Sequence, residues 1–138
     1  RDLDGNVYAW GDNGTGQLGL NDENNRDVPT QVAALTDISF IAAGLNNSFA
    51  VDGDGNLYSW GQNTTGQLGL GDDVDRDEPE QVTGIADVAW VAASAFHTVA
   101  ADGDGNVYAW GRNDNGELGV GDVLGRDTPT LVPYFGGG

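Results

Sequence analysis

Two segments of the chain carry aspartates at a spacing that could hold a cation. Residues 52–56 read Asp-Gly-Asp-Gly-Asn, and residues 102–106 repeat them. In an EF-hand loop the oxygen ligands would be Asp52, Asp54 and Asn56, but such a loop also needs glycine next and glutamate at its twelfth position. Leu57 and Asn63 stand there instead. Because Asp, Gly and Asn also supply the positive φ angles of tight turns, both segments are predicted to be hairpin turns.

The loop at residues 72–77 is a second acidic candidate, with four aspartates around Arg76. A cation could bind there, but a run of like charges is more often a solvated surface, and we expect no metal site. Arg76 recurs as Arg26 and Arg126, and each of the three arginines is followed by an aspartate. This recurrence predicts a structural salt bridge or cap within each repeat rather than a contact to a partner.

Neither the histidine nor the glycines form a catalytic or cofactor-binding pattern. His97 is the only histidine. A general base needs a partner and a substrate pocket, and no pattern of serine, cysteine or second histidine surrounds His97. Residues 66–69, Gly-Gln-Leu-Gly, lack the Gly-Lys-Ser/Thr ending of a phosphate loop. We therefore predict no catalytic residue and no cofactor, and we do not expect an enzyme.

A period of 50 residues runs through the chain and positions these segments. Tryptophans at 10, 60 and 110 and prolines at 29, 79 and 129 follow it. A fixed period in this range indicates a repeat architecture. The positions that are identical in all three copies include a Trp-Gly pair and a later Gly-x-Leu-Gly element. They form the structural repeat motif, which consists of Trp10, Gly11, Gly16, Leu18, Gly19, Trp60, Gly61, Gly66, Leu68, Gly69, Trp110, Gly111, Gly116, Leu118 and Gly119.

The second repeat, residues 37–86, contains four short runs with strand character. These runs are rich in β-branched and aromatic residues and are bounded by turns with glycine or aspartate, and they cover residues 38–44, 48–51, 56–60 and 79–82. No segment sustains a helical period. Four antiparallel strands per repeat form the blade of a β-propeller, so the predicted fold class is all-β.

Side-chain size and alternation predict how such blades stack. Only small side chains fit where strands crowd at the propeller axis, so the alanine pairs at 42–43 and 92–93 are expected on the innermost strands. Tyr58 and Trp60 share one face of their strand, because side chains alternate along a strand. We expect this aromatic face to pack against the neighbouring blade, where a large ring buries the most area.

The three repeats are not equally complete. Residues 1–36 are predicted to form a partial blade of two outer strands, residues 37–86 and 87–136 two complete blades, and residues 137–138 a tail. The expected product is an open arc of about two and a half blades. Because a propeller closes with about 4 to 8 blades, we interpret this arc as part of a longer propeller.

The charge balance restricts the expected partners. The 138-residue chain has no cysteine or methionine, and its formal net charge is −17. Such a field repels phosphate groups, so neither nucleic acid nor a membrane is an expected partner. The Asp-rich composition without lysine resembles that of proteins from extreme halophiles and suggests a high-salt environment. The compartment stays open, since no signal-peptide pattern and no apolar run of membrane-helix length is visible.

The repeat pattern Gly-x-x-Tyr-x-Trp-Gly-x-Asn-x-x-Gly-Gln-Leu-Gly, followed by Pro-x-x-Val, resembles that of the regulator of chromosome condensation family. In the second copy it consists of Gly55, Tyr58, Trp60, Gly61, Asn63, Gly66, Gln67, Leu68, Gly69, Pro79 and Val82. The resemblance implies a seven-bladed propeller whose loops bind other macromolecules. The known roles include nucleotide exchange on a small GTPase, inhibition of β-lactamases and ultraviolet sensing in plants.

The chain departs from this family at the inner hairpin, where Gly-x-x-His-Ser/Thr is common. Here the hairpin reads Gly-Leu-Asn-Asn-Ser at 44–48 and Ser-Ala-Phe-His-Thr at 94–98. Leu45 and Ala95 stand where the plant photoreceptor has tryptophan, so light sensing is not expected. The basic surface on which chromatin docking relies in the namesake protein is also missing.

Positions that vary between copies are the candidate partner surface. They lie at the hairpin tips and in the long loops, and the residues predicted to bind a partner are Asn46, Asn47, Phe96, His97, Arg112 and Asp114. Phe96 and Arg112 are the best anchors, because aromatic and arginine side chains dominate interface hot spots. The alternative is that these are surface residues that vary between copies without binding a partner.

Together these patterns predict a non-enzymatic scaffold for protein–protein interaction, an arc of a regulator-of-chromosome-condensation-like propeller. The expected partners are another protein bound through loops on a propeller face, and the remaining blades of a parent chain or a second copy. Two alternatives stay open. One is a guanine-nucleotide exchange regulator of a small GTPase, and the other is a secreted inhibitor or adhesion module.

Overall fold

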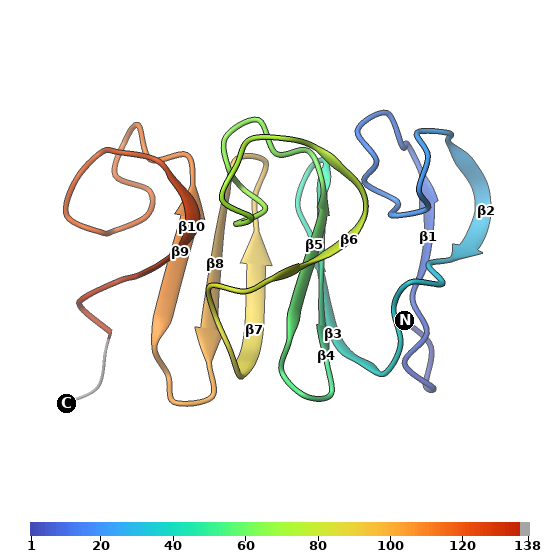
Figure 1. The fold of residues 1–138 in the computed structure, drawn as a ribbon, viewed down its shortest axis with the longest axis horizontal. Coiled ribbons are helices and arrows are strands. Elements are labelled where there is room, and N and C mark those ends of the chain that lie inside the picture. The colour runs from blue at the N-terminus through green and yellow to red at the C-terminus, as the bar shows by residue number, and fades with distance from the viewer. Residues whose placement is uncertain (136–138) are drawn as a thin grey trace.

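Ten antiparallel strands form the computed structural model, which describes residues 1–135 (Figure 1). The strands are β1 (Tyr8–Gly11), β2 (Arg26–Gln31), β3 (Ile38–Ala43), β4 (Asn47–Asp52), β5 (Leu57–Gly61), β6 (Arg76–Val82), β7 (Val88–Ala93), β8 (His97–Asp102), β9 (Val107–Gly111) and β10 (Arg126–Leu131). Within this described range no helix is long and apolar enough to cross a membrane. The prediction of an all-β fold is confirmed.

The strands form one two-stranded and two four-stranded sheets, which stand in a row (Figure 1). The first sheet pairs β1 with β2, the second has the order β3-β4-β5-β6, and the third has the order β7-β8-β9-β10. β3 and β4 of the second sheet contact β7 of the third. The row does not close on itself, so the predicted open arc of about two and a half blades is confirmed. Residues 136–138, which include the predicted tail, lie outside the described range.

The outer strand is longer than the sequence predicts. β6 begins at Arg76, three residues before Pro79, where the expected strand began. Arg76 pairs with Gly61 and Glu80 pairs with Ser59, with a shift of register between the two pairs. Pro79 therefore lies inside the strand rather than at its start. It is tolerated there because this strand is at the edge of the sheet, next to the irregularity, where no ladder donor is lost.

Apolar side chains fill the spaces between the sheets. The largest cluster joins Phe49 and Leu57 of the second sheet to Val91 and Trp110 of the third. A second cluster joins Val7 and Val32 beside the first sheet to residues of the second sheet, Trp60 among them. Because each blade shares its core with the next, a single blade has no complete core of its own.

Candidate functional site

The Trp-Gly and Gly-x-Leu-Gly elements meet across the boundary between blades. Trp60 Nε1 donates a hydrogen bond of 2.9 Å to the carbonyl of Gln17, and Trp110 Nε1 donates one of 2.9 Å to the carbonyl of Gln67. A Cβ on Gly69 would lie 2.8 Å from Trp110 Nε1, so the ring leaves no room for a side chain. The expectation that the aromatic face packs against the neighbouring blade is confirmed for Trp60 and Trp110.

A buried asparagine organises the long loop of each blade. Asn63 is fully buried, and its Nδ2 donates to the carbonyls of Asp72 at 3.0 Å and Val74 at 3.1 Å. Its Oδ1 accepts a hydrogen bond of 3.0 Å from the backbone N–H of Leu68. Asn13 and Asn113 occupy the same place in the other repeats. The repeat pattern of the sequence includes this asparagine, and its recurrence every 50 residues is the signal that could have identified it as a structural residue. The pattern alone does not show that its side chain organises the long loop.

The arginine of each outer strand pairs with an aspartate of its own long loop. Arg76 contacts Asp72 at 2.7 Å and also Glu80, and the corresponding Arg26–Asp22 and Arg126–Asp122 distances are 2.6 and 2.7 Å. The hydrogen bond from Arg76 holds the pKa of Asp72 below its usual value. The predicted salt bridge within the repeat is confirmed, and its acidic partner stands four residues before the arginine rather than directly after it.

The Asp-Gly-Asp-Gly-Asn segments are hairpin turns closed by their first aspartate. The Asp52 carboxylate accepts hydrogen bonds from the backbone N–H of Asp54 at 3.0 Å and of Asn56 at 2.9 Å, and another from Asn56 Nδ2 at 2.9 Å. Gly55 has a φ of +81°. Asp102 makes the equivalent contacts, and the hydrogen bond from Asn106 lowers its pKa. These aspartates therefore serve the turn, as the sequence predicts.

The hairpin tips and the long loops gather at one end of the blades, which we call the tip face. It comprises residues 44–47, 62–75, 94–97 and 112–125 (Figure 1). The loop of the second blade holds the tip of the third: Thr65 Oγ1 donates to the carbonyl of Phe96 at 2.9 Å, and Gln67 Nε2 donates to that of Ala95 at 3.2 Å. The tips are thus fixed by side chains of the preceding blade.

Two of the predicted anchors lie against each other on this face. The Arg112 guanidinium is 5.4 Å from the centre of the Phe96 ring, a cation–π distance. Arg112 Nε lies 3.1 Å from Asp114 Oδ2 and 3.7 Å from Glu117 Oε1. The Phe96 ring is exposed to solvent. The third blade therefore presents an aromatic ring beside a cation and two carboxylates.

The remaining predicted residues make contacts within the protein. Asn47 is only 2% exposed, and its Nδ2 donates to the carbonyl of Ser94 in the next blade at 3.1 Å. Asn46 is half-buried, and its carbonyl accepts a hydrogen bond of 2.8 Å from Gln62. His97 Nδ1 lies 2.9 Å from Ser94 Oγ. All six predicted residues are at the tip face, but the Asn47 side chain points into the contact between blades, because its polar partner lies there.

A family model, the regulator of chromosome condensation (RCC1) repeat, matches the chain over residues 4–51, 54–101 and 104–138. A second RCC1 repeat model matches residues 38–67 and 88–117. These matches cover nearly all of the chain. The chain belongs to the RCC1 repeat family.

Curated relatives share single RCC1 repeats with this chain. The mitochondrial RCC1 domain-containing protein RUG3 of Arabidopsis thaliana is 46% identical over 50 residues, which are 35% of this chain and 11% of RUG3. The probable E3 ubiquitin-protein ligase HERC4 of Homo sapiens is 43% identical over 51 residues, which are 36% of this chain and 5% of HERC4. The chain thus spans a small part of the length of these relatives.

Solved RCC1-type propellers have the same arrangement of blades. Human WBSCR16 superposes with a TM-score of 0.81 at 27% identity, over 94% of this chain and 33% of that protein. Prp20p of Saccharomyces cerevisiae, described with its binding to Gsp1p and histones, superposes with a TM-score of 0.72 at 29% identity, over 90% of this chain and 34% of Prp20p. The described residues therefore correspond to about a third of a propeller of this type.

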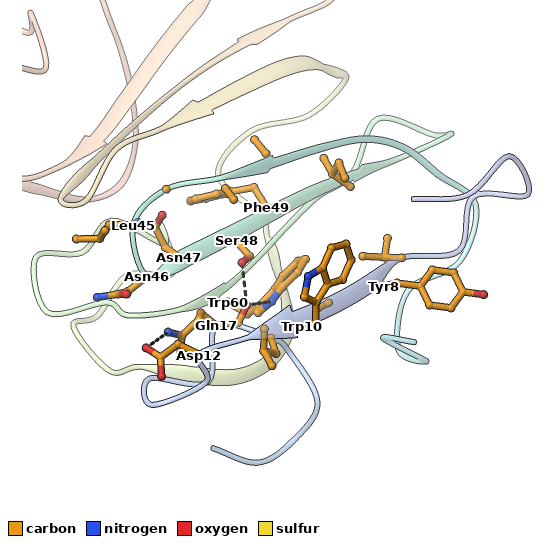
Figure 2. A pocket seen from close by; sticks show the side chains of 17 residues that line it. Tyr8, Trp10, Asp12, Gln17, Leu45, Asn46, Asn47, Ser48, Phe49 and Trp60 are labelled. Carbon is orange, nitrogen blue, oxygen red and sulfur yellow. Dashed lines mark hydrogen bonds between the residues drawn. The ribbon is translucent and has the colours of Figure 1, made fainter. Parts of the chain in front are cut away.

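The first RCC1 repeat of the chain borders a cavity of about 520 Å³ (Figure 2). The cavity lies between β1 and the β3–β4 hairpin, and Trp10, Ile41, Asn46, Phe49 and Trp60 are among its lining residues. Figure 2 shows Ser48 and Trp60 on one side, both bonded to Gln17 of the first repeat. The sequence patterns do not predict this cavity, which lies beside the two-stranded β1–β2 sheet.

Proposed function

We propose that this chain is a non-enzymatic scaffold for protein–protein interaction, which binds a partner through its tip face. The observation that carries the proposal is the exposed Phe96 ring stacked beside Arg112, on a hairpin tip fixed by Thr65 and Gln67 of the preceding blade. Residues that differ between copies are thereby presented on a rigid frame. Aromatic and arginine side chains are the commonest hot spots of interfaces, and a fixed tip loses little entropy on binding.

The relatives support a protein as the partner. Prp20p is described with its binding to Gsp1p and histones, and yeast RCC1 has been solved bound to Kap60. The charge of −17 favours a partner with a basic surface over one with exposed phosphates. HERC4 is named as a probable ubiquitin-protein ligase, but the match covers only 5% of that protein. The match is therefore no argument for ligase activity in this chain.

Photocrosslinking tests the scaffold function. A photoreactive phenylalanine analogue replaces Phe96 on the tip face, and in a matched control it replaces Asp104, which is exposed at the opposite end of the blade. In an extract of the cells that make the protein, we expect a discrete crosslinked protein from position 96 that disappears in Arg112→Ala. Equal crosslinking from both positions, or none from position 96, would contradict the proposal.

A regulator of nucleotide exchange on a small GTPase is the second candidate, favoured by the likeness to Prp20p. A release assay with Gsp1p loaded with fluorescent GDP separates the two candidates. For the scaffold we expect the release rate to be the same with and without the chain. Faster release that depends on chain concentration would favour the exchange regulator instead.

A further inference from the structure

The chain contains the tripeptide Asp-Asn-Gly twice, at residues 12–14 and 114–116. Asparagine followed by glycine is prone to spontaneous deamidation, because glycine has no Cβ to hinder the approach of its backbone nitrogen to the asparagine side chain. The two tripeptides are shifted by two positions within the repeat, so the fold places their asparagines in different surroundings. Their chemistry needs no partner, and an inference about it is independent of the proposed function.

Asn13 is enclosed by its own long loop and is fully buried. Its Nδ2 donates to the carbonyls of Asp22 at 2.7 Å and Asn24 at 3.1 Å, and its Oδ1 accepts a hydrogen bond of 2.9 Å from the backbone N–H of Leu18. Deamidation requires the side chain to turn toward the nitrogen of Gly14, which breaks these bonds. Asn13 can therefore react only after the loop has opened.

Asn115 lies on the tip face and is exposed. Within the described residues its side chain makes one hydrogen bond, from Nδ2 to Glu117 Oε1 at a long 3.4 Å. The N–H of Gly116 donates to the carbonyl of Asn113 at 3.0 Å, and opening this turn bond is a small local fluctuation. Thr65, the equivalent residue of the second blade, is only half-buried although the hairpin tip of the third blade lies against it. Water therefore reaches this position even within a contact between blades.

We propose that Asn115 is a site of spontaneous deamidation in the folded protein, whereas burial protects Asn13. In this reaction the backbone nitrogen of Gly116 forms a bond to Asn115 Cγ, and the side-chain nitrogen leaves as ammonia with the proton that the Gly116 nitrogen has lost. Water then opens the resulting succinimide ring at one of its two carbonyls. The product is aspartate or isoaspartate, in which the backbone continues through the side-chain carboxyl. The net change is hydrolysis of one amide by one water molecule.

The same conversion would have different effects at the two positions. A carboxylate at position 115 cannot donate to Glu117, and it adds a negative charge next to a carboxylate whose Oε1 lies 3.7 Å from Arg112 Nε. The product therefore changes the charge of the tip face and leaves the core intact. An aspartate at position 13 would place an acceptor against the two carbonyls to which Asn13 donates, and buried acceptors would be left unpaired. The fold thus protects the position where deamidation would damage the loop.

Mass spectrometry of the aged protein tests this inference. The full chain is incubated at neutral pH in molar potassium chloride, and a parallel sample is incubated unfolded in urea. Cleavage after arginine then separates residues 2–26, which contain Asn13, from residues 113–126, which contain Asn115. In urea we expect both asparagines to deamidate at similar rates. In the folded sample Asn115 should react within a few-fold of its unfolded rate, whereas Asn13 should react at least about tenfold more slowly than when unfolded.

Three variants, whose folding is checked by circular dichroism, locate the effect. Asn115→Thr, which introduces the residue of the first two repeats, should abolish deamidation in residues 113–126. Asp22→Ala removes a carboxylate 3.2 Å from Asn13 Nδ2 and should raise the rate at Asn13, whereas the matched control Asp122→Ala should leave that rate unchanged. If Asp22→Ala does not fold, the comparison of folded and unfolded wild type decides alone. Equal rates at the two asparagines in the folded protein, or no reaction at Asn115, would overturn the inference.

Discussion

At the scale of single residues, the glycine that receives the next blade's tryptophan has no room for a side chain. Gly69 has a φ of +77°, and Trp110 covers it. Gly119 has a φ of +67° and only Val132 near its Cβ position, at 3.6 Å. Gly69→Ala should therefore lower the free energy of unfolding by about 1–3 kcal/mol more than Gly119→Ala does, because only the former pushes against a ring. Urea unfolding of the two variants measures this difference.

The pair is matched because both substitutions force an alanine into the left-handed region, which by itself costs about 1–2 kcal/mol. The difference between the two losses in unfolding free energy is therefore the energetic effect of the contact with Trp110. Equal losses in the two variants would mean that the ring moves aside freely and that the close approach has little energetic effect.

At the scale of elements, the contact of Asp72 with Arg76 ties the long loop to the outer strand β6. The pKa of Asp72 is lowered in the folded protein, so the unfolded chain binds the proton first as the pH falls. The stabilisation by this contact is complete above the unfolded-state pKa, near 3.8, and is lost as the pH falls through the lower folded-state value. In Asp72→Asn, the free energy of unfolding should therefore fall less steeply toward low pH than in the wild type. Urea unfolding between about pH 6 and pH 2.5 in molar salt measures it.

The experiment is done in molar salt for the following reason. A fall in pH also protonates the other carboxylates, which reduces the repulsion among them and stabilises the fold. Screening by salt suppresses this opposing effect. Asp122→Asn, in the equivalent contact with Arg126, should behave like Asp72→Asn. Unfolding free energies of the wild type and of Asp72→Asn that run parallel throughout this pH range would contradict the role of the pair.

At the scale of the whole molecule, repulsion among carboxylates opposes the packing of one blade on the next. The formal net charge of −17 is spread over a chain whose cores lie between sheets. Because salt screens this repulsion, we expect the melting temperature to rise by about 10 °C or more from low to molar potassium chloride, equivalent to roughly 2 kcal/mol. Melting followed by circular dichroism tests this. Equal melting temperatures would contradict adaptation to high salt.

Much of the architecture follows from local sequence patterns. The alternation in residues 56–60 and the Asp-Gly turn before them predict the β4–β5 hairpin, because both signals act within a few residues. The 50-residue period predicts repeated blades and the incomplete first one. The extension of β6 to Arg76 could not be predicted in this way, since it depends on the register shift against Gly61.

The sequence by itself determined the strands, the turns, the repeat and the positions that vary between copies. Only the tertiary structure decided that Gln17 receives Trp60, 43 residues further along the chain, that Asn47 is directed into the next blade, and that Arg112 lies against Phe96. The physical reason is that spacing along a strand specifies which face a side chain occupies. What that face meets depends on how one sheet is rotated against the next, and this rotation is set by packing between residues far apart in the sequence.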